Sequence, residues 1–155
     1  MIEKVFFYLE EQWYKGCLAE AAEAVRSYAQ YGLKADLLVI EAGEGIPEPE
    51  YSALYLADSK RLLQMLSDRG AAFCAYSHSA NQGEELRPAD YVLMEPQWVD
   101  RDSLVKIWQR QRHLPWTIVE TERCVVREFV PEDLEAPSED LDKERKILTA
   151  YIDRV

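Results

Sequence analysis

The stretch that decides the fold is "SALYLADSKRLLQMLSDRGAAFCAYSHS", residues 52–79. It opens with a short apolar run, continues with apolar residues at helical spacing, and returns to a second apolar run at residues 71–76. Asp58 or Ser59 is placed to cap the helix, and Gly70 is placed to end it. A strand, a helix and a strand in this order form the repeating unit of a parallel sheet.

The same alternation extends on both sides of this stretch. We expect further strands at residues 4–10, 35–42 and 90–95, a helix at 17–31, and a last helix that starts after Asp100 or Asp102 and ends before Pro115. Residues 42–52 show no helical pattern, so this connection is an irregular loop or an antiparallel return. The sequence therefore predicts an α/β fold, with a mainly parallel five-stranded sheet and helices on both faces, over residues 1–115.

Charge and cysteine usage limit the partners of the chain. The net charge is -11, with 29 acidic against 18 basic residues, and the bases form no cluster. Nucleic acids and anionic membranes need a basic face, so neither is an expected partner. No segment approaches the ~20 apolar residues of a membrane span, and the first residues do not resemble a signal peptide. The three cysteines form no C-x-x-C pair, which favours a reducing compartment and a cytoplasmic location.

Residues 116–155 have a different pattern and form a predicted strand–helix extension. "TERCVVREF", residues 121–129, alternates as a half-buried strand does, and an apolar stripe from Glu139 onward predicts an amphipathic helix. A lone strand exposes unpaired backbone groups, and such a helix must bury its stripe. We therefore predict that residues 121–155 dock on residues 1–115 or join two copies in a homodimer.

The motif "ETERCVVREFVPEDLEA", residues 120–136, resembles the start of a GNAT-type N-acetyltransferase domain, whose first strand reads T-E-R-L-x-L-R and is followed by E-D-L. The resemblance implies a full-length parent enzyme that uses acetyl-CoA. That family holds the cofactor on a later [Q/R]-x-x-G-x-[G/A] loop. The nearest match, "IEAGEGI", has Ile40 at the Gln/Arg position and precedes the resemblance. We therefore expect an incomplete GNAT domain over residues 116–155, truncated before its acetyl-CoA site, and no cofactor on this chain.

Residues 54–96 resemble part of a haloacid-dehalogenase-like Rossmann domain, in which a strand ending in D-S leads to a helix and then to a strand ending in Ser or Thr. Enzymes of that family use a D-x-D pair at a strand end. Here Asp58 is followed two residues later by Lys60, so the resemblance implies the fold without the catalytic acids.

Polar side chains follow two of the predicted strands. Asp58 and Ser59 follow one, and Ser77, His78 and Asn81 follow the other. In open parallel sheets ligands bind beyond the carboxyl ends of the strands, so these five residues are the candidate ligand pocket. They also allow two other interpretations, a small hydrolase that uses Asp58 and His78, or helix caps and loop hydrogen bonds. The G-x-S-x-G elbow of serine hydrolases is absent, and the two histidines are too far apart in sequence to indicate a metal site.

Three functions remain as hypotheses. The first is an accessory or regulatory α/β domain of a GNAT-family acetyltransferase, without catalysis on this chain. The second is a stand-alone interaction module that dimerises through its C-terminal strand and helix. The third is the small hydrolase based on Asp58 and His78.

Overall fold

The computed structural model describes residues 1–128, and for residues 117–120 it describes the backbone alone. The chain divides into two compact units, Met1–Arg112 and a unit that begins at His113. None of the helices within the described residues is both long and apolar enough to cross a bilayer.

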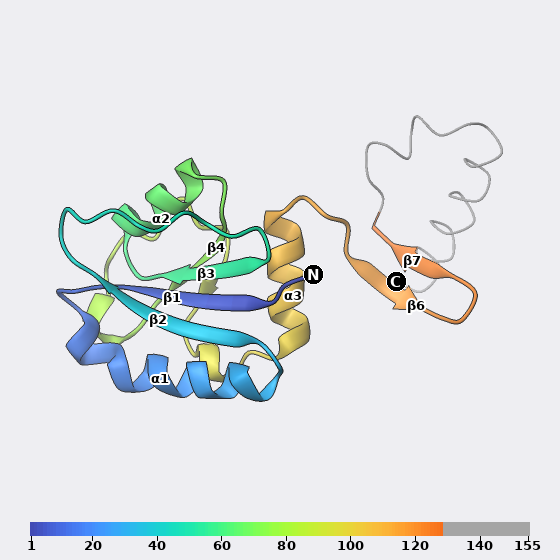
Figure 1. Ribbon diagram of the computed structural model, residues 1–155, viewed down its shortest axis with the longest axis horizontal. Helices are drawn as coiled ribbons and strands as arrows, with labels where there is room; N and C mark the ends of the chain where they lie inside the picture. The colour runs from blue at the N-terminus through green and yellow to red at the C-terminus, as the bar shows by residue number, and fades with distance from the viewer. Residues whose placement is uncertain (129–155) are drawn as a thin grey trace. The chain divides into compact units, whose positions relative to one another are not determined.

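The first unit is an α/β sheet structure (Figure 1). Its strands are β1 (Lys4–Glu10), β2 (Lys34–Ile40), β3 (Ala53–Ala57), β4 (Ala72–Tyr76) and β5 (Val92–Leu93). Its helices are α1 (Tyr14–Gln30), α2 (Lys60–Asp68) and α3 (Arg101–Gln111), with 3-10 turns η1 (Ser79–Asn81) and η2 (Pro96–Trp98). The five strands pair in the order β2-β1-β3-β4-β5, and every pair is parallel. The predicted five-stranded parallel sheet is thus confirmed.

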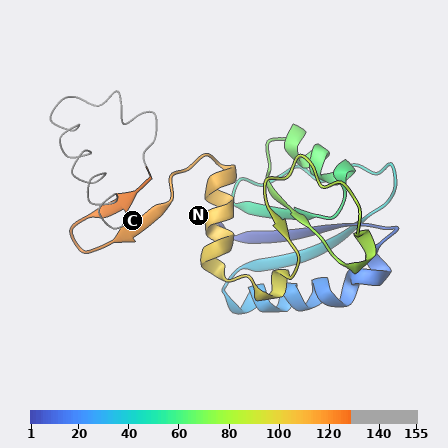
Figure 2. The ribbon, with the colours of Figure 1, turned by 180° about the vertical axis from the view of Figure 1, so that it is seen from behind.

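Two apolar cores lie on opposite faces of the sheet. On one face α1 and α3 cover β1, β3 and β4 through residues such as Tyr28 and Leu104. On the other face α2 buries Leu62, Leu63 and Leu66. Figure 1 shows α1 and α2 on opposite sides of the sheet, and Figure 2 shows the same arrangement from behind. The prediction of helices on both faces is confirmed.

The strand order places a topological switch point between β1 and β3. From β1 the chain goes through α1 to β2 on one side, then crosses back through residues 41–52 to β3 on the other side. Because β3 is parallel to β1, this connection is a crossover loop, and the alternative of an antiparallel return was wrong. In doubly wound sheets the connections that follow two such strands lead in opposite directions. They leave a crevice at the carboxyl ends of the strands, and ligands bind there.

Several element boundaries differ from the predicted ones. Helix α1 begins at Tyr14 rather than Cys17. The fifth strand covers Val92–Leu93 rather than residues 90–95, because it is an edge strand that pairs with β4 alone and Pro96 starts η2. Of the alternative caps, Ser59 caps α2 and Asp100 caps α3.

In the second unit, β7 (Val125–Arg127) pairs antiparallel with β6 (Thr117–Glu120). The strand predicted from residue 121 starts later, because Thr121 and Cys124 close the turn of this hairpin through a 2.8 Å backbone hydrogen bond. The predicted strand therefore finds a partner in the segment directly before it. The predicted helix beyond Glu139 lies outside the described residues, and docking or dimerisation through residues 121–155 stays a prediction.

Candidate functional site

A buried polar network joins the carboxyl ends of β1, β3 and β4. Asp58, directly after β3, is fully buried. Its Oδ1 accepts a hydrogen bond from the Glu10 backbone N–H at 2.9 Å, and its Oδ2 lies 2.8 Å from His78 Nε2. Asn81 donates to the Asp58 and Tyr76 carbonyl oxygens, both at 2.9 Å, and accepts from the His78 backbone N–H. The neighbouring strands thus bring together the Asp and His that the sequence predicts to be close.

The hydrogen bonds of His78 determine its tautomer. The Ala80 N–H donates to Nδ1 at 3.1 Å, so Nδ1 carries no proton. The proton of the neutral imidazole is therefore on Nε2, which donates to Asp58. A serine-protease-type triad needs one imidazole nitrogen for the carboxylate and the other for the nucleophile. In His78 both nitrogens are already engaged, so the arrangement does not favour the hydrolase.

Within the described residues no Lys or Arg pairs with the Asp58 carboxyl, and the imidazole that faces it is neutral while its Nδ1 accepts from the Ala80 N–H. Burial raises the pKa of this carboxyl above its usual value, and the hydrogen bonds from His78 and Glu10 act in the opposite direction. Asp58 is therefore a buried carboxyl group that accepts hydrogen bonds from the Glu10 N–H and from His78.

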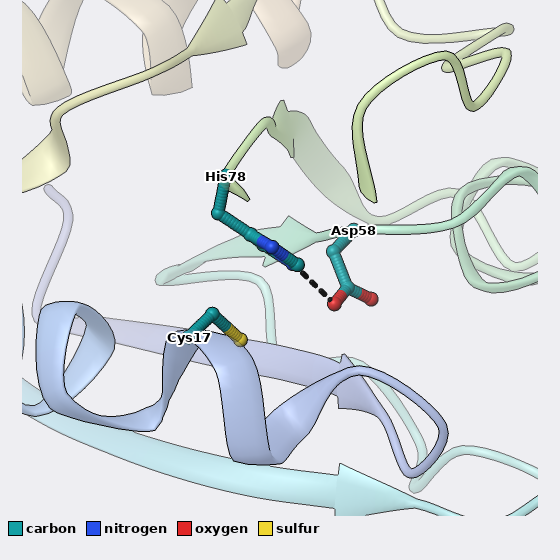
Figure 3. A group of neighbouring side chains, drawn as sticks. All are labelled: Cys17, Asp58 and His78. Atoms are coloured by element: carbon teal, nitrogen blue, oxygen red, sulfur yellow. Dashed lines mark hydrogen bonds and ion pairs between the residues drawn. The ribbon is translucent and has the colours of Figure 1, made fainter. Parts of the chain in front are cut away.

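Cys17 of α1 lies beside this pair, as Figure 3 shows. The donor atoms of Cys17, Asp58 and His78 lie within 4.8 Å of one another, and all three residues are buried. Sulfur, imidazole and carboxylate are ligands of Zn²⁺. A metal on Nε2 needs the imidazole proton on Nδ1, where a carbonyl or carboxylate would accept it. Here Nδ1 faces the Ala80 N–H instead, so the donor set does not fit a transition metal.

The thiol of Cys17 is also poorly suited to catalysis. Burial raises its pKa to about 12, with a further contribution from Asp58. The thiol donates weakly to the Tyr14 carbonyl, with a sulfur–oxygen distance of 3.9 Å. A cysteine nucleophile reacts as a thiolate, and both imidazole nitrogens of the neighbouring His78 are already engaged with other groups. The side chains of Cys17, Asp58 and His78 are therefore best described as part of the buried polar network in the core.

Thiol reactivity provides a test of this description. Cys17 and Cys74 are buried, with the pKa of each raised to about 12 by burial, whereas Cys124 is exposed. We expect a chromogenic aromatic disulfide to modify one thiol per native chain rapidly and all three in denaturant. In Cys124→Ser the rapid phase should disappear. If Cys17 reacts as fast as Cys124, it is not buried in the polar network.

A cleft lies at the switch point itself, with a volume of about 600 Å³. We call it the switch-point cleft; its walls include Glu10, Glu11, Lys15, Arg61 and Glu84. Glu10 is nearly buried, and both of its carboxylate oxygens bind Arg61, at 2.8 and 2.9 Å. The charges of Glu10 and Arg61 are therefore neutralised by each other.

Arg61 and Ser59 connect this cleft to the surrounding elements. Besides binding Glu10, Arg61 donates to the carbonyl oxygens of Glu41 and Glu44 in the crossover loop, at 3.1 and 2.9 Å. Ser59 accepts from the Leu62 N–H as the cap of α2 and donates to Glu10 at 2.7 Å. The end of β1, the start of α2 and the crossover loop are thus held together at one point.

The five predicted site residues divide into three groups. Asp58, His78 and Asn81 belong to the buried polar network. Ser59 contacts Glu10 at the switch-point cleft. Ser77 lines a second cleft beyond β4 and β5, together with His78.

Sequence reasoning did not identify Glu10, Arg61 and Cys17 as members of these sites. Glu10 does end the first apolar run, which is the position from which it could have been inferred. No motif marks Cys17 or Arg61.

Comparison with known proteins identifies no relative of this chain. No family model matches the chain, and no curated protein or solved structure is significantly similar to it.

Proposed function

We propose that the first unit is an accessory or regulatory α/β domain that carries out no catalysis of its own. The observation that supports this proposal is the state of Asp58 and His78. Both imidazole nitrogens and both carboxylate oxygens are engaged within the protein. The groups that a hydrolase would use are thus part of the core, where they join three strands.

The second part of the proposal is that this domain belongs to a cytoplasmic GNAT-family N-acetyltransferase. It is supported by the resemblance of residues 121–134 to the opening of such a domain. Acetyl-CoA would then be the cofactor of the acetyltransferase to which this domain belongs. The cytoplasmic location agrees with the cysteines, which are free in the described residues.

Calorimetric titration with acetyl-CoA tests this proposal on the chain as it is. We expect no binding heat, because the sequence contains no loop of amide groups of the kind that holds the cofactor pyrophosphate in this family. A complete GNAT enzyme titrated in the same buffer is the positive control. A micromolar dissociation constant for the chain would contradict the proposal that these residues contain no acetyl-CoA site.

A further inference from the structure

The second cleft has a volume of about 720 Å³ and lies beyond the carboxyl ends of β4 and β5, against α1. We call it the β4–β5 cleft; its lining residues are Glu20, Ser77, His78, Ser79, Gln82, Met94, Glu95 and Gln97. Small-molecule pockets have volumes of roughly 300–1,000 Å³ and favour this end of a parallel sheet. Size and position therefore both agree with a ligand site.

The charge of this lining has one sign. Glu20 from α1 and Glu95 after β5 contribute carboxylates, and no Lys or Arg is among the lining residues. Within residues 1–128 neither carboxylate takes part in an ion pair. Behind His78 lies the buried Asp58 carboxyl. The potential in this cleft is therefore negative.

The uncharged lining groups add hydrogen-bond acceptors and an apolar wall. Ser77 and Ser79 carry hydroxyl groups. Within the described part of the chain the buried Oε1 of Gln97 accepts no hydrogen bond, which is costly unless a donor is supplied. Met94 is 71% exposed and offers an apolar side chain at the same cleft. A ligand that matches these groups donates hydrogen bonds, carries positive charge and has an apolar chain.

The switch-point cleft does not select a ligand in this way. Its walls mix acids with Lys15 and Arg61, and its nearly buried acid Glu10 is already bound to Arg61. A ligand there would compete with an existing ion pair. In the β4–β5 cleft neither Glu20 nor Glu95 is in an ion pair with another described residue.

We propose that the β4–β5 cleft binds an organic ammonium ion, such as an alkyl diamine or triamine. Its amines interact with Glu20 and Glu95, and its methylene chain contacts Met94. Charge-assisted hydrogen bonds of this kind are stronger than those between neutral groups. The inference does not depend on the acetyltransferase proposal, because all of the residues involved belong to the first unit.

The probe for the test is spermidine, titrated into the full chain by calorimetry at low ionic strength. We expect binding that weakens about tenfold in Glu95→Gln and in Glu20→Gln, because each variant removes one ionic partner. Glu23→Gln is the matched control: it is an exposed acid on the same helix as Glu20, does not line the cleft, and changes the net charge equally. It should alter the dissociation constant by less than about twofold.

Two results of the spermidine titration would overturn the proposal. One is the absence of binding at millimolar spermidine. The other is an equal weakening in Glu23→Gln and Glu95→Gln, which would indicate diffuse attraction to an acidic protein of net charge -11. Butanediol, an uncharged chain with hydroxyl ends, should not bind, and binding as tight as that of spermidine would overturn the requirement for a cation. Because all three glutamates are exposed, the variants should melt at the wild-type temperature, which separates ligand effects from folding effects.

Discussion

Replacing Asp58 by alanine is expected to lower the free energy of unfolding of the first unit by about 3–5 kcal/mol. The substitution leaves the Glu10 N–H and the His78 Nε2–H buried without an acceptor. It also leaves a void where three strand ends meet. Urea unfolding followed by circular dichroism measures the change as a lower midpoint at an unchanged slope.

Two further variants show whether the loss comes from this network. Asp36→Ala removes an exposed acid on the edge strand β2 and should stay within about 0.5 kcal/mol of wild type. His78→Gln keeps an N–H donor at the position of Nε2, so its loss should be smaller than that of Asp58→Ala. A loss below about 1 kcal/mol for Asp58→Ala would show that Asp58 is not a structural centre.

The stability lost in Asp58→Ala is expected to depend on pH in a definite direction. Because burial raises the pKa of Asp58 above 3.8, the folded state binds a proton at a pH where the unfolded state has released it. This contribution to stability is therefore largest below pH 3.8 and is lost as pH rises through the folded pKa. The stability difference between wild type and Asp58→Ala should thus grow as pH falls through that window. If this difference shrinks as pH falls, the hydrogen bonds lower the pKa of Asp58 by more than burial raises it.

The sequence predicts which strand ends form the buried polar network, but not all of the hydrogen bonds within it. Apolar runs and caps locate the ends of β3 and β4, and parallel pairing then places Asp58 near His78. The tautomer of His78 could not be predicted, because it depends on the Ala80 N–H in the η1 turn. Gly16 contributes to the position of that turn: a side chain there would bring its Cβ to 2.9 Å from the Cβ of Ala80. Such close approaches between distant segments leave no periodic pattern in the sequence.

The ion pair of Glu10 and Arg61 was beyond prediction for a similar reason. The two residues are 51 positions apart, and their contact depends on which residue of β1 ends level with the start of α2. The crossover loop that Arg61 holds shows no secondary structure of its own over residues 44–50. A loop without regular hydrogen bonds must be held by side chains, and here one arginine donates to two of its carbonyl groups.

Replacing Arg61 by alanine is therefore expected to have the second largest effect, a loss of about 2–3 kcal/mol. The variant leaves the nearly buried Glu10 carboxylate without its cation, although the Ser59 hydroxyl still donates to it. We place the value below that of Asp58→Ala because the Arg61 side chain is 34% exposed, so water partly screens the pair. Urea unfolding again measures the loss.

Hydrogen exchange distinguishes loss of the ion pair from loss of the loop contacts. In Arg61→Ala, exchange should accelerate at the amides of the crossover loop, residues 41–52, because the carbonyl groups of Glu41 and Glu44 lose their arginine donor and Glu41 keeps, among the described residues, only the Glu44 N–H. Lys60→Ala is the control: within the described part of the chain this neighbouring residue forms a surface ion pair with Glu85 alone, so its effect should stay within about 0.5 kcal/mol. Adding Glu10→Gln to Arg61→Ala should recover part of the stability, because the buried charge is then removed together with its partner. If the double variant is as unstable as Arg61→Ala and loop exchange is unchanged, the arginine stabilises α2 by packing rather than by joining β1 to the loop.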